Sequence, residues 1–435
     1  MVPVLPTEEK ARPVHQHLRL RRQPRRLTAI AGALVAGLSL AACSGSSTAI
    51  GTSSSGPSSR PSGSSSAATP SPSSTDSGTT NVYAAASRDA FTGAAKTARS
   101  LVYVPNTISN TVQVIDPATY RVIGRFHTGH EPQHVVPSWD MKTLWVNDDL
   151  GNDLIPIDPR TGKQGKSVPV MDPYNLYFTP DGAHALVMAE RLRRIDVLDP
   201  HTMALQRSLP VPCHGVNHAD YSADLSFFVA SCEFSGKLLV IDRNATKIVK
   251  VIDLNAIKTP GATSPQMAHS MGGPKSNLEP GASSMPQDVR LTPDGTHFLA
   301  ADMLRNGVWV INARTLAYEK FIHTGTGAHG IYPDREGKRL FVSNRDVGSI
   351  SVLDASTLAI AATWPIPGGG SPDMGGVSAD GTKLWLSGRY HSVVYVFDTT
   401  TGKVLRRIPV DAGPHGLAVW PQPGRFSLGH TGNTR

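Results

Sequence analysis

Charged side chains are scarce in this chain of 435 residues, at 17%, and aromatic side chains make up only 6%. Glycine and proline are instead abundant, with 40 and 34 residues. This composition is typical of many short strands joined by turns and argues against a helical protein. The net charge of +8 comes mainly from the N-terminal region, because the residues after 42 hold 35 basic and 32 acidic side chains. Without a basic run or a basic-aromatic stripe in that part, nucleic acid is not an expected partner.

The chain also lacks an apolar run long enough to span a membrane. Its apolar stretch at residues 27–40 is too short for a spanning helix, and it follows a basic segment at 19–26. The sequence LAAC at 40–43 resembles the bacterial lipobox, in which the cysteine receives a diacylglyceryl group. We therefore expect residues 1–42 to be a lipoprotein signal peptide and Cys43 to anchor the exported protein by lipid to the outer face of the bacterial cell membrane. A plain secretory signal followed by a chance cysteine is the alternative.

Apolar side chains are almost missing from residues 43–82, which consist mainly of Ser, Gly, Thr, Pro and Ala. Such a segment cannot offset the entropy lost on ordering, so we expect a disordered tether. Residues 83–100 include two short alanine runs and fit either a short helix or a continuation of the tether.

From residue 101 onward the chain repeats itself. One unit is a β-run that ends in Asp or Asn, and its last residues are 42, 41, 43, 70, 42 and 44 positions apart. The copies are TVQVID at 111–116, LIPID at 154–158, IDVLD at 195–199, LLVID at 238–242, VWVIN at 308–312, ISVLD at 350–354 and VYVFD at 394–398. Seven copies in step indicate a repeat architecture, and the long spacing locates one insertion at about 255–282.

A second unit recurs in register with the first and carries turn chemistry. It reads PYNLYFTPDG at 173–182, PQDVRLTPDG at 286–295 and PHGLAV at 414–419, with strands such as FVSN at 341–344 after the turn. Proline and glycine at these positions favour hairpin turns. Together the units resemble the YVTN-repeat family of β-propellers, whose repeat has a Pro-His-Gly segment, a Pro-Asp-Gly turn and a Tyr-Val-Thr-Asn strand. The resemblance covers residues 101–421 and implies an all-β fold.

The strand count specifies the architecture. The domain begins at residue 101 with the second strand of a blade, continues through six four-strand units and ends with a lone first strand at 415–420. Pairing that strand with residues 101–104 would remove the exposed sheet edges. We expect a seven-bladed β-propeller of four-stranded antiparallel blades over 101–421, closed by a clasp between its N- and C-terminal strands. The tail at 422–435 is apolar around Phe426 and Leu428, so we expect it to pack on the propeller.

Cysteine is nearly absent, with only two residues besides Cys43. Cys213 precedes the first strand of one blade and Cys232 ends the strand paired with it, so the hairpin brings them together. A disulfide is expected in an oxidising compartment, with two buried reduced thiols as the alternative.

The first strand of each propeller blade lines the central channel, so residues at equivalent positions in that strand gather around the axis. Polar side chains occupy many of these positions. They are Gln133, Tyr174, Asn217, Gln287, Asp288 and Asp373, together with four histidines, His134, His218, His329 and His415.

Histidine recurs near the channel beyond these four positions. His130 and His214 precede the channel strands of two blades, and the insertion adds Met267, His269 and Met271. Imidazole is a common ligand of zinc and copper, and a thioether favours copper. Copper or zinc is therefore a candidate cofactor, although polar side chains also serve to satisfy buried backbone groups in wet channels.

A catalytic nucleophile motif such as Gly-x-Ser-x-Gly is absent from the sequence. The first functional hypothesis is a membrane-anchored, non-catalytic binding module for a protein, glycan or small molecule. The alternative is a metal-binding propeller, including a copper-dependent oxidoreductase, that uses the channel histidines. A hydrolytic or lactonase-like active site is a third hypothesis.

Overall fold

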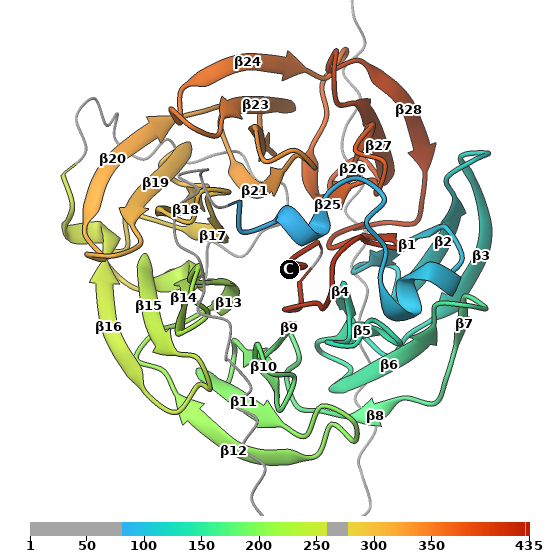
Figure 1. The fold of residues 1–435 in the computed structure, drawn as a ribbon, viewed down its shortest axis with the longest axis horizontal. Helices are drawn as coiled ribbons and strands as arrows, with labels where there is room; N and C mark the ends of the chain where they lie inside the picture. The colour runs from blue at the N-terminus through green and yellow to red at the C-terminus, as the bar shows by residue number, and fades with distance from the viewer. Residues whose placement is uncertain (1–80, 259–276, 431) are drawn as a thin grey trace, which may run out of the picture. The chain divides into compact units, whose positions relative to one another are not determined.

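Seven four-stranded antiparallel blades surround a central axis in the computed structural model, which describes residues 81–258, 277–430 and 432–435 (Figure 1). The seven-bladed propeller predicted from the repeat is therefore confirmed. The insertion near 255–282 falls between blades four and five, and most of it lies outside the described residues. Among the described residues, no helix is long and apolar enough to cross a membrane.

Each blade runs from an innermost strand at the axis to an outer strand at the rim. Blade one consists of β29 (Ala418–Trp420), β1 (Leu101–Asn106), β2 (Thr111–Asp116) and β3 (Arg121–His127). Blade two consists of β4 (Pro132–Pro137), β5 (Leu144–Asp148), β6 (Asp153–Asp158) and an outer strand in two pieces, β7 (Lys163–Gln164) and β8 (Val168–Pro169). Blade three consists of β9 (Asn175–Phe178), β10 (Ala185–Ala189), β11 (Arg194–Leu198) and β12 (Leu205–Pro210), and blade four of β13 (Val216–Tyr221), β14 (Phe227–Cys232), β15 (Lys237–Asp242) and β16 (Ile248–Asp253).

The remaining three blades follow the same order. Blade five consists of β17 (Pro286–Leu291), β18 (His297–Asp302), β19 (Gly307–Asn312) and β20 (Tyr318–His323). Blade six consists of β21 (Ala328–Pro333), β22 (Arg339–Asn344), β23 (Ser349–Asp354) and β24 (Ile360–Pro365). Blade seven consists of β25 (Pro372–Val377), β26 (Lys383–Gly388), β27 (Val393–Asp398) and β28 (Val404–Pro409).

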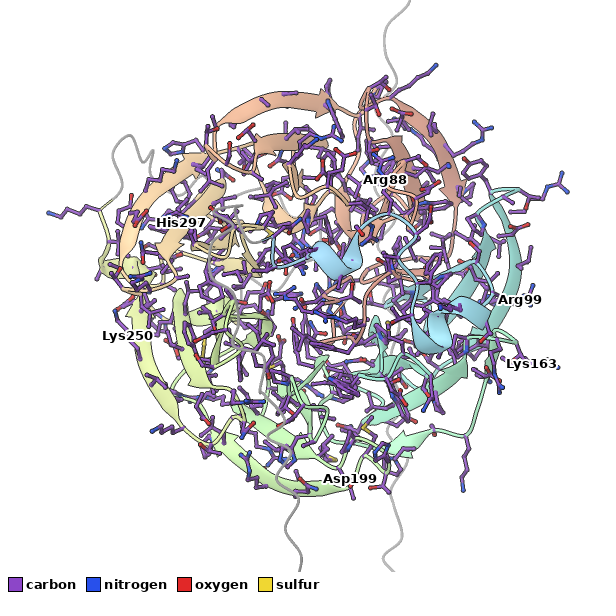
Figure 2. All side chains as sticks on the ribbon, viewed as in Figure 1. Arg88, Arg99, Lys163, Asp199, Lys250 and His297 are labelled. Carbon is purple, nitrogen blue, oxygen red and sulfur yellow. A yellow bond between two sulfur atoms is a disulfide. The ribbon has the colours of Figure 1, made fainter. Side chains whose placement is uncertain are left out.

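Burial explains why these runs form strands. The three inner strands of each blade are mainly buried, whereas outer strands such as β3 and β12 alternate between exposed and half-buried residues. Hydrophobic clusters form between adjacent blades; one of them joins Val229 and Val240 of blade four to Val289 and Trp309 of blade five. Polar side chains such as Lys250 project from the rim in Figure 2. Each sheet therefore buries both faces against its neighbours, as β-branched and aromatic residues favour.

The first blade is closed by strands from both ends of the domain. Strand β29 pairs with β1 in an antiparallel register that joins Leu101 to Trp420 and Tyr103 to Ala418. The predicted clasp is confirmed, because the lone first strand completes the blade that the N-terminal strands begin.

The chain on either side of the clasp covers one end of the channel. The N-terminal segment forms two short 3₁₀ helices, η1 (Ala84–Ala86) and η2 (Gly93–Thr97), and the C-terminus lies near the centre of the ring (Figure 1). The tail is tied to innermost strands: Phe178 donates its amide to the carbonyl of Leu428 at 3.0 Å, and His430 donates to Leu176 at 3.1 Å. Phe426 stacks on Trp139 with ring centroids 5.6 Å apart. The tail thus packs at the C-terminal ends of the innermost strands.

A disulfide joins Cys213 to Cys232 within blade four, with their Cα atoms 6.0 Å apart. It links the residue run that enters β13 to the end of β14. Another 3₁₀ helix, η3 (Glu233–Ser235), follows Cys232 directly, and η4 (Leu254–Ala256) follows β16.

Candidate functional site

Four histidines meet in the channel because they occupy neighbouring register positions in the innermost strands of four blades. His134 lies on β4 and His218 on β13, while His329 lies on β21 and His415 precedes β29. The ring of His134 lies 4.8 Å from that of His415 and 5.5 Å from that of His218, centroid to centroid. The His218 and His329 rings are 6.3 Å apart. The repeat register therefore brings together the four channel histidines that the sequence analysis singled out.

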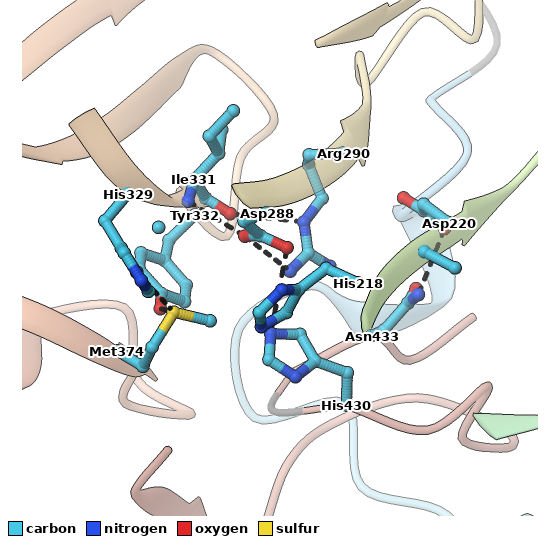
Figure 3. Close-up of polar contacts among 12 residues, drawn as sticks. His218, Asp220, Asp288, Arg290, His329, Ile331, Tyr332, Met374, His430 and Asn433 are labelled. Carbon is cyan, nitrogen blue, oxygen red and sulfur yellow. Dashed lines mark hydrogen bonds and ion pairs between the residues drawn. The ribbon is translucent and has the colours of Figure 1, made fainter. Parts of the chain in front are cut away.

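A fifth histidine joins them from the tail. The ring of His430 lies 5.0 Å from that of His218 and 5.2 Å from that of His134 (Figure 3 shows His218 and His430 beside each other). Donor atoms of His134, His218 and His430 all lie within 4.8 Å of one another. Sequence reasoning missed His430 because the tail is not part of the repeat; only its apolar composition indicated that it would dock. We call the five residues His134, His218, His329, His415 and His430 the histidine cluster.

Polar neighbours on the innermost strands orient two of these rings. Nδ1 of His218 is 3.0 Å from Oδ1 of Asn217, and Nδ1 of His415 is 2.7 Å from Oδ2 of Asp373. Both partners are acceptors, so each Nδ1 carries the proton and each Nε2 keeps its lone pair. A carboxylate or amide behind the ring is the usual outer support of a metal-bound histidine.

His430 is oriented by two other residues of the channel. Its Nδ1 lies 3.2 Å from Nδ2 of Asn175, and its Nε2 lies 3.7 Å from Oδ1 of Asp288. Asp288 is fully buried and accepts the amide of Ile331 at 2.9 Å (Figure 3).

Several ring nitrogens of the cluster make no hydrogen bond among the described residues. Both nitrogens of His134 and the Nε2 atoms of His218, His415 and His430 are buried and have no hydrogen bond among the described residues. A buried polar group without a partner costs about 1–3 kcal/mol. When several such atoms lie close together in a protein, water molecules or a bound ion usually satisfy them.

Burial keeps the whole cluster uncharged at neutral pH. It lowers the pKa of His218 to about 3, and it holds the pKa of His134, His329, His415 and His430 well below the usual value of 6.5. Repulsion between protonated rings would oppose a second charge in the cluster, and it lowers the pKa of His134 further. Neutral imidazole is the form that binds metals, so the cluster needs no deprotonation to act as a ligand set.

The remaining predicted channel residues are all buried, and some of them contact the cluster. Tyr174 contacts His134 edge to face at 5.5 Å, and Asp373 lies 3.1 Å from Nδ1 of His329. Met374, at the channel position of blade seven that is equivalent to His134 and His218, places its sulfur 3.0 Å from the same Nδ1. The buried channel-lining residues are Gln133, Tyr174, Asn217, Gln287, Asp288 and Asp373.

Two of the candidate ligands lie outside the cluster. His130 is exposed, and Nε2 of His214 is 3.5 Å from Glu279, in the loops that enter β4 and β13. The structure does not bring them to the other histidines, because each precedes its innermost strand and sits outside the channel. Met267, His269 and Met271 lie outside the described residues.

The fold and the cluster define a class: a closed seven-bladed β-propeller with buried, neutral histidines in its channel. The model of the YNCE-like beta-propeller family matches residues 79–203 and 277–423, which is more than half of the chain. The chain belongs to this family of β-propellers. No curated protein matches its sequence significantly.

Solved structures share the fold at low sequence identity. Kuenenia stuttgartiensis hydrazine synthase matches with a TM-score of 0.54 and 18% identity, over 70% of this chain and 94% of that one. A functionally unknown protein from Desulfotomaculum acetoxidans matches with a TM-score of 0.57 and 14% identity, over 74% and 99%. Dihydro-heme d1 dehydrogenase NirN matches with a TM-score of 0.52 and 15% identity, over 76% of each chain. These similarities show the propeller fold alone, so the function has to be inferred from the residues of the site.

Proposed function

We propose that this chain is an extracytoplasmic binding propeller whose channel holds one ion of copper or zinc. The observation that supports the proposal is the triad of His134, His218 and His430, whose buried donor atoms lie within 4.8 Å of one another. All three rings are neutral at pH 7, and each has a nitrogen with no hydrogen bond among the described residues. A metal ion would bind the free lone pairs of His134 and His218 directly. It would bind Nε2 of His430 once the proton of that ring lies on Nδ1, with the Asn175 amide turned so that its oxygen accepts it.

The donor set narrows the choice of metal. Three imidazoles without a thiolate suit zinc and copper, whereas magnesium and calcium prefer oxygen ligands. His415 is the candidate fourth ligand, because its Nε2 has no partner and Asp373 holds its Nδ1. When bound, the ion would cross-link blades two and four to the tail.

Metal analysis of protein purified without an affinity tag tests this proposal. We expect about one copper or zinc per chain by mass spectrometry of the digested protein, and less than a tenth of that in the His134→Ala, His218→Ala variant. His201→Ala, an exposed histidine in a turn of blade three, is the matched control and should keep the metal. Wild-type protein that neither contains nor takes up copper or zinc would refute the metal site and favour a binding module for another ligand.

The location is a second part of the proposal, supported by the LAAC sequence that ends at Cys43. A diacylglyceryl anchor at this residue would hold the propeller on the outer face of the cell membrane. We expect Cys43→Ala to release the protein from the membrane fraction into the medium. Equal membrane association of the variant would argue against the anchor.

A further inference from the structure

The residue that directly follows the second strand of each blade stands at the end of the channel opposite the tail. In five blades its backbone amide donates to the carbonyl of the residue before the innermost strand; Asp149 donates to Glu131 at 3.2 Å and Arg345 to Gly327 at 2.8 Å. These residues are thus equivalent, and we call them the mouth ring. In blade order they are Thr107, Asp149, Glu190, Glu233, Met303, Arg345 and Arg389.

Acidic and basic residues occupy separate arcs of the mouth ring. Blades two to four contribute acids, Asp149, Glu190 and Glu233, whereas blades six and seven contribute Arg345 and Arg389. The neutral residues of blades one and five separate the two arcs. Asp149, Glu233 and Arg345 are at most 9% exposed, so these groups are buried and are not part of a solvated outer surface.

Neighbouring side chains neutralise the arcs only in part. Arg191 lies 3.4 Å from Asp149 and 2.7 Å from Asp172, and Asp373 lies 3.1 Å from Arg345. Several buried polar atoms of the ring nevertheless have no hydrogen bond among the described residues. They are Oε2 of Glu190, Nε of Arg345 and Nη1 of Arg389, the last at 3.9 Å from Asp373.

The two arcs are close enough to affect each other. Burial raises the pKa of Glu233, and the positive charges of Arg345 and Arg389 act against that rise. Burial and the charge of Glu233 raise the pKa of Glu190.

The geometry of the channel also links the arcs. Asn217 donates to Glu233 at 2.7 Å and holds His218, whose ring lies 6.3 Å from that of His329. His329 in turn lies 3.1 Å from Asp373, the partner of Arg345, so the acidic and basic arcs stand on two sides of the same channel.

We propose that the mouth ring binds a small zwitterion of the amino-acid class, with its ammonium group on Glu190 and Glu233 and its carboxylate on Arg345 and Arg389. A simple cation would leave Nε of Arg345 and Nη1 of Arg389 unpaired, and a simple anion would leave Oε2 of Glu190 unpaired. Burial raises the pKa of Glu190 and Glu233, and a bound ammonium group would favour their charged forms. A molecule with both charges satisfies both arcs, and guanidinium is the side chain best shaped to hold a carboxylate. The mouth ring uses no residue of the histidine cluster, but it adjoins it: Asp373 contacts both Arg345 and His415, and Asn217 contacts both Glu233 and His218.

Calorimetric titration with unbranched ω-amino acids, from glycine to 6-aminohexanoate, tests the proposal. Butylamine and butyrate serve as single-charge probes. We expect one chain length to bind at least tenfold more tightly than either probe, because only a zwitterion pairs both arcs. The proposal is wrong if no member of the series binds at about 10 mM, or if butylamine or butyrate binds equally well.

Variants show whether the ring is responsible. Glu190→Gln and Arg389→Gln should each weaken zwitterion binding at least tenfold. The exposed residues Glu336 and Arg406, changed to Gln, are matched controls and should have no effect. His134→Ala should keep zwitterion binding even if it loses the metal. Loss of binding in His134→Ala alone would show that the amino acid sits on the metal and would overturn the mouth site.

Discussion

Gly416 determines how closely the closing segment of the chain approaches His134. The two residues form an isolated β-bridge, and a Cβ atom on Gly416 would lie only 2.0 Å from Nδ1 of His134. The ring must therefore move if residue 416 carries a side chain. A metal site loses affinity when its ligands are displaced, even by small shifts.

We predict that Gly416→Ala weakens binding of copper or zinc at least tenfold and lowers the free energy of unfolding by about 1–3 kcal/mol. Metal titration and urea unfolding measure the two effects. Gly376→Ala is the matched control, because Gly376 lies on β25 and has open space where its Cβ would be. Unchanged metal affinity in Gly416→Ala would show that His134 is not a ligand.

Asp148 is a buried carboxylate at the end of β5, and its ionised form lowers the stability of the folded protein at neutral pH. Burial raises its pKa to about 6, and the nearby charge of Asp153 adds to the rise; hydrogen bonds from the amides of His130 and Gly129 oppose it. In the unfolded chain the carboxyl has its ordinary pKa of 3.8. Because the pKa of this carboxyl group is higher in the folded protein than in the unfolded chain, the group stabilises the folded protein fully at pH values below 3.8. This stabilisation is lost as the pH rises through about 6.

We predict that Asp148→Asn stabilises the protein by about 1–2 kcal/mol more at pH 8 than at pH 4. Asparagine fits this position, since Asn106 and Asn344 occupy it in blades one and six and are buried there. Urea unfolding of both proteins across this pH range measures the difference. A constant difference in stability at all pH values would contradict the raised pKa.

At the scale of elements, the repeat made the strands and their order predictable. Turn residues and β-runs recur at nearly constant spacing, so strand positions and the pairing of β29 with β1 followed from counting. The same register places His134, His218, His329 and His415 around one axis. Equivalent residues of a closed ring must face the same channel.

Elements outside the repeat were not predictable in the same way. His430 reaches the histidine cluster because the tail docks on β9, and tail docking depends on Phe426, Leu428 and backbone hydrogen bonds that have no periodic signature. His130 has the right residue type at a nearby position, but it lies in a loop and stays exposed. Register therefore identifies channel residues, whereas loops and the tail need the three-dimensional structure.

At the scale of the whole molecule, the clasp determines whether the ring stays closed. Seven blades pack only on their neighbours, so stability is shared along the ring and depends on each contact between blades. Blade one is the blade built from both ends of the domain. Trp420 of β29 is 1% exposed and packs in one hydrophobic cluster with Leu101, Tyr103 and Val135. This cluster spans blades one and two, so it holds the joined ends against the next blade.

We predict that Trp420→Ala lowers the free energy of unfolding by about 3–5 kcal/mol and opens the ring at the clasp before the rest unfolds. Hydrogen exchange followed by mass spectrometry should then show fast exchange in β1 and β29 together. Trp309→Ala is the matched control, because Trp309 is fully buried in blade five and its loss should cost similar stability without exposing the clasp. Identical exchange patterns in the two variants would show that the clasp is no weaker than any other contact between blades. Selective exchange at the clasp would instead identify blade one as the place where the propeller opens, and with it the tail that carries His430.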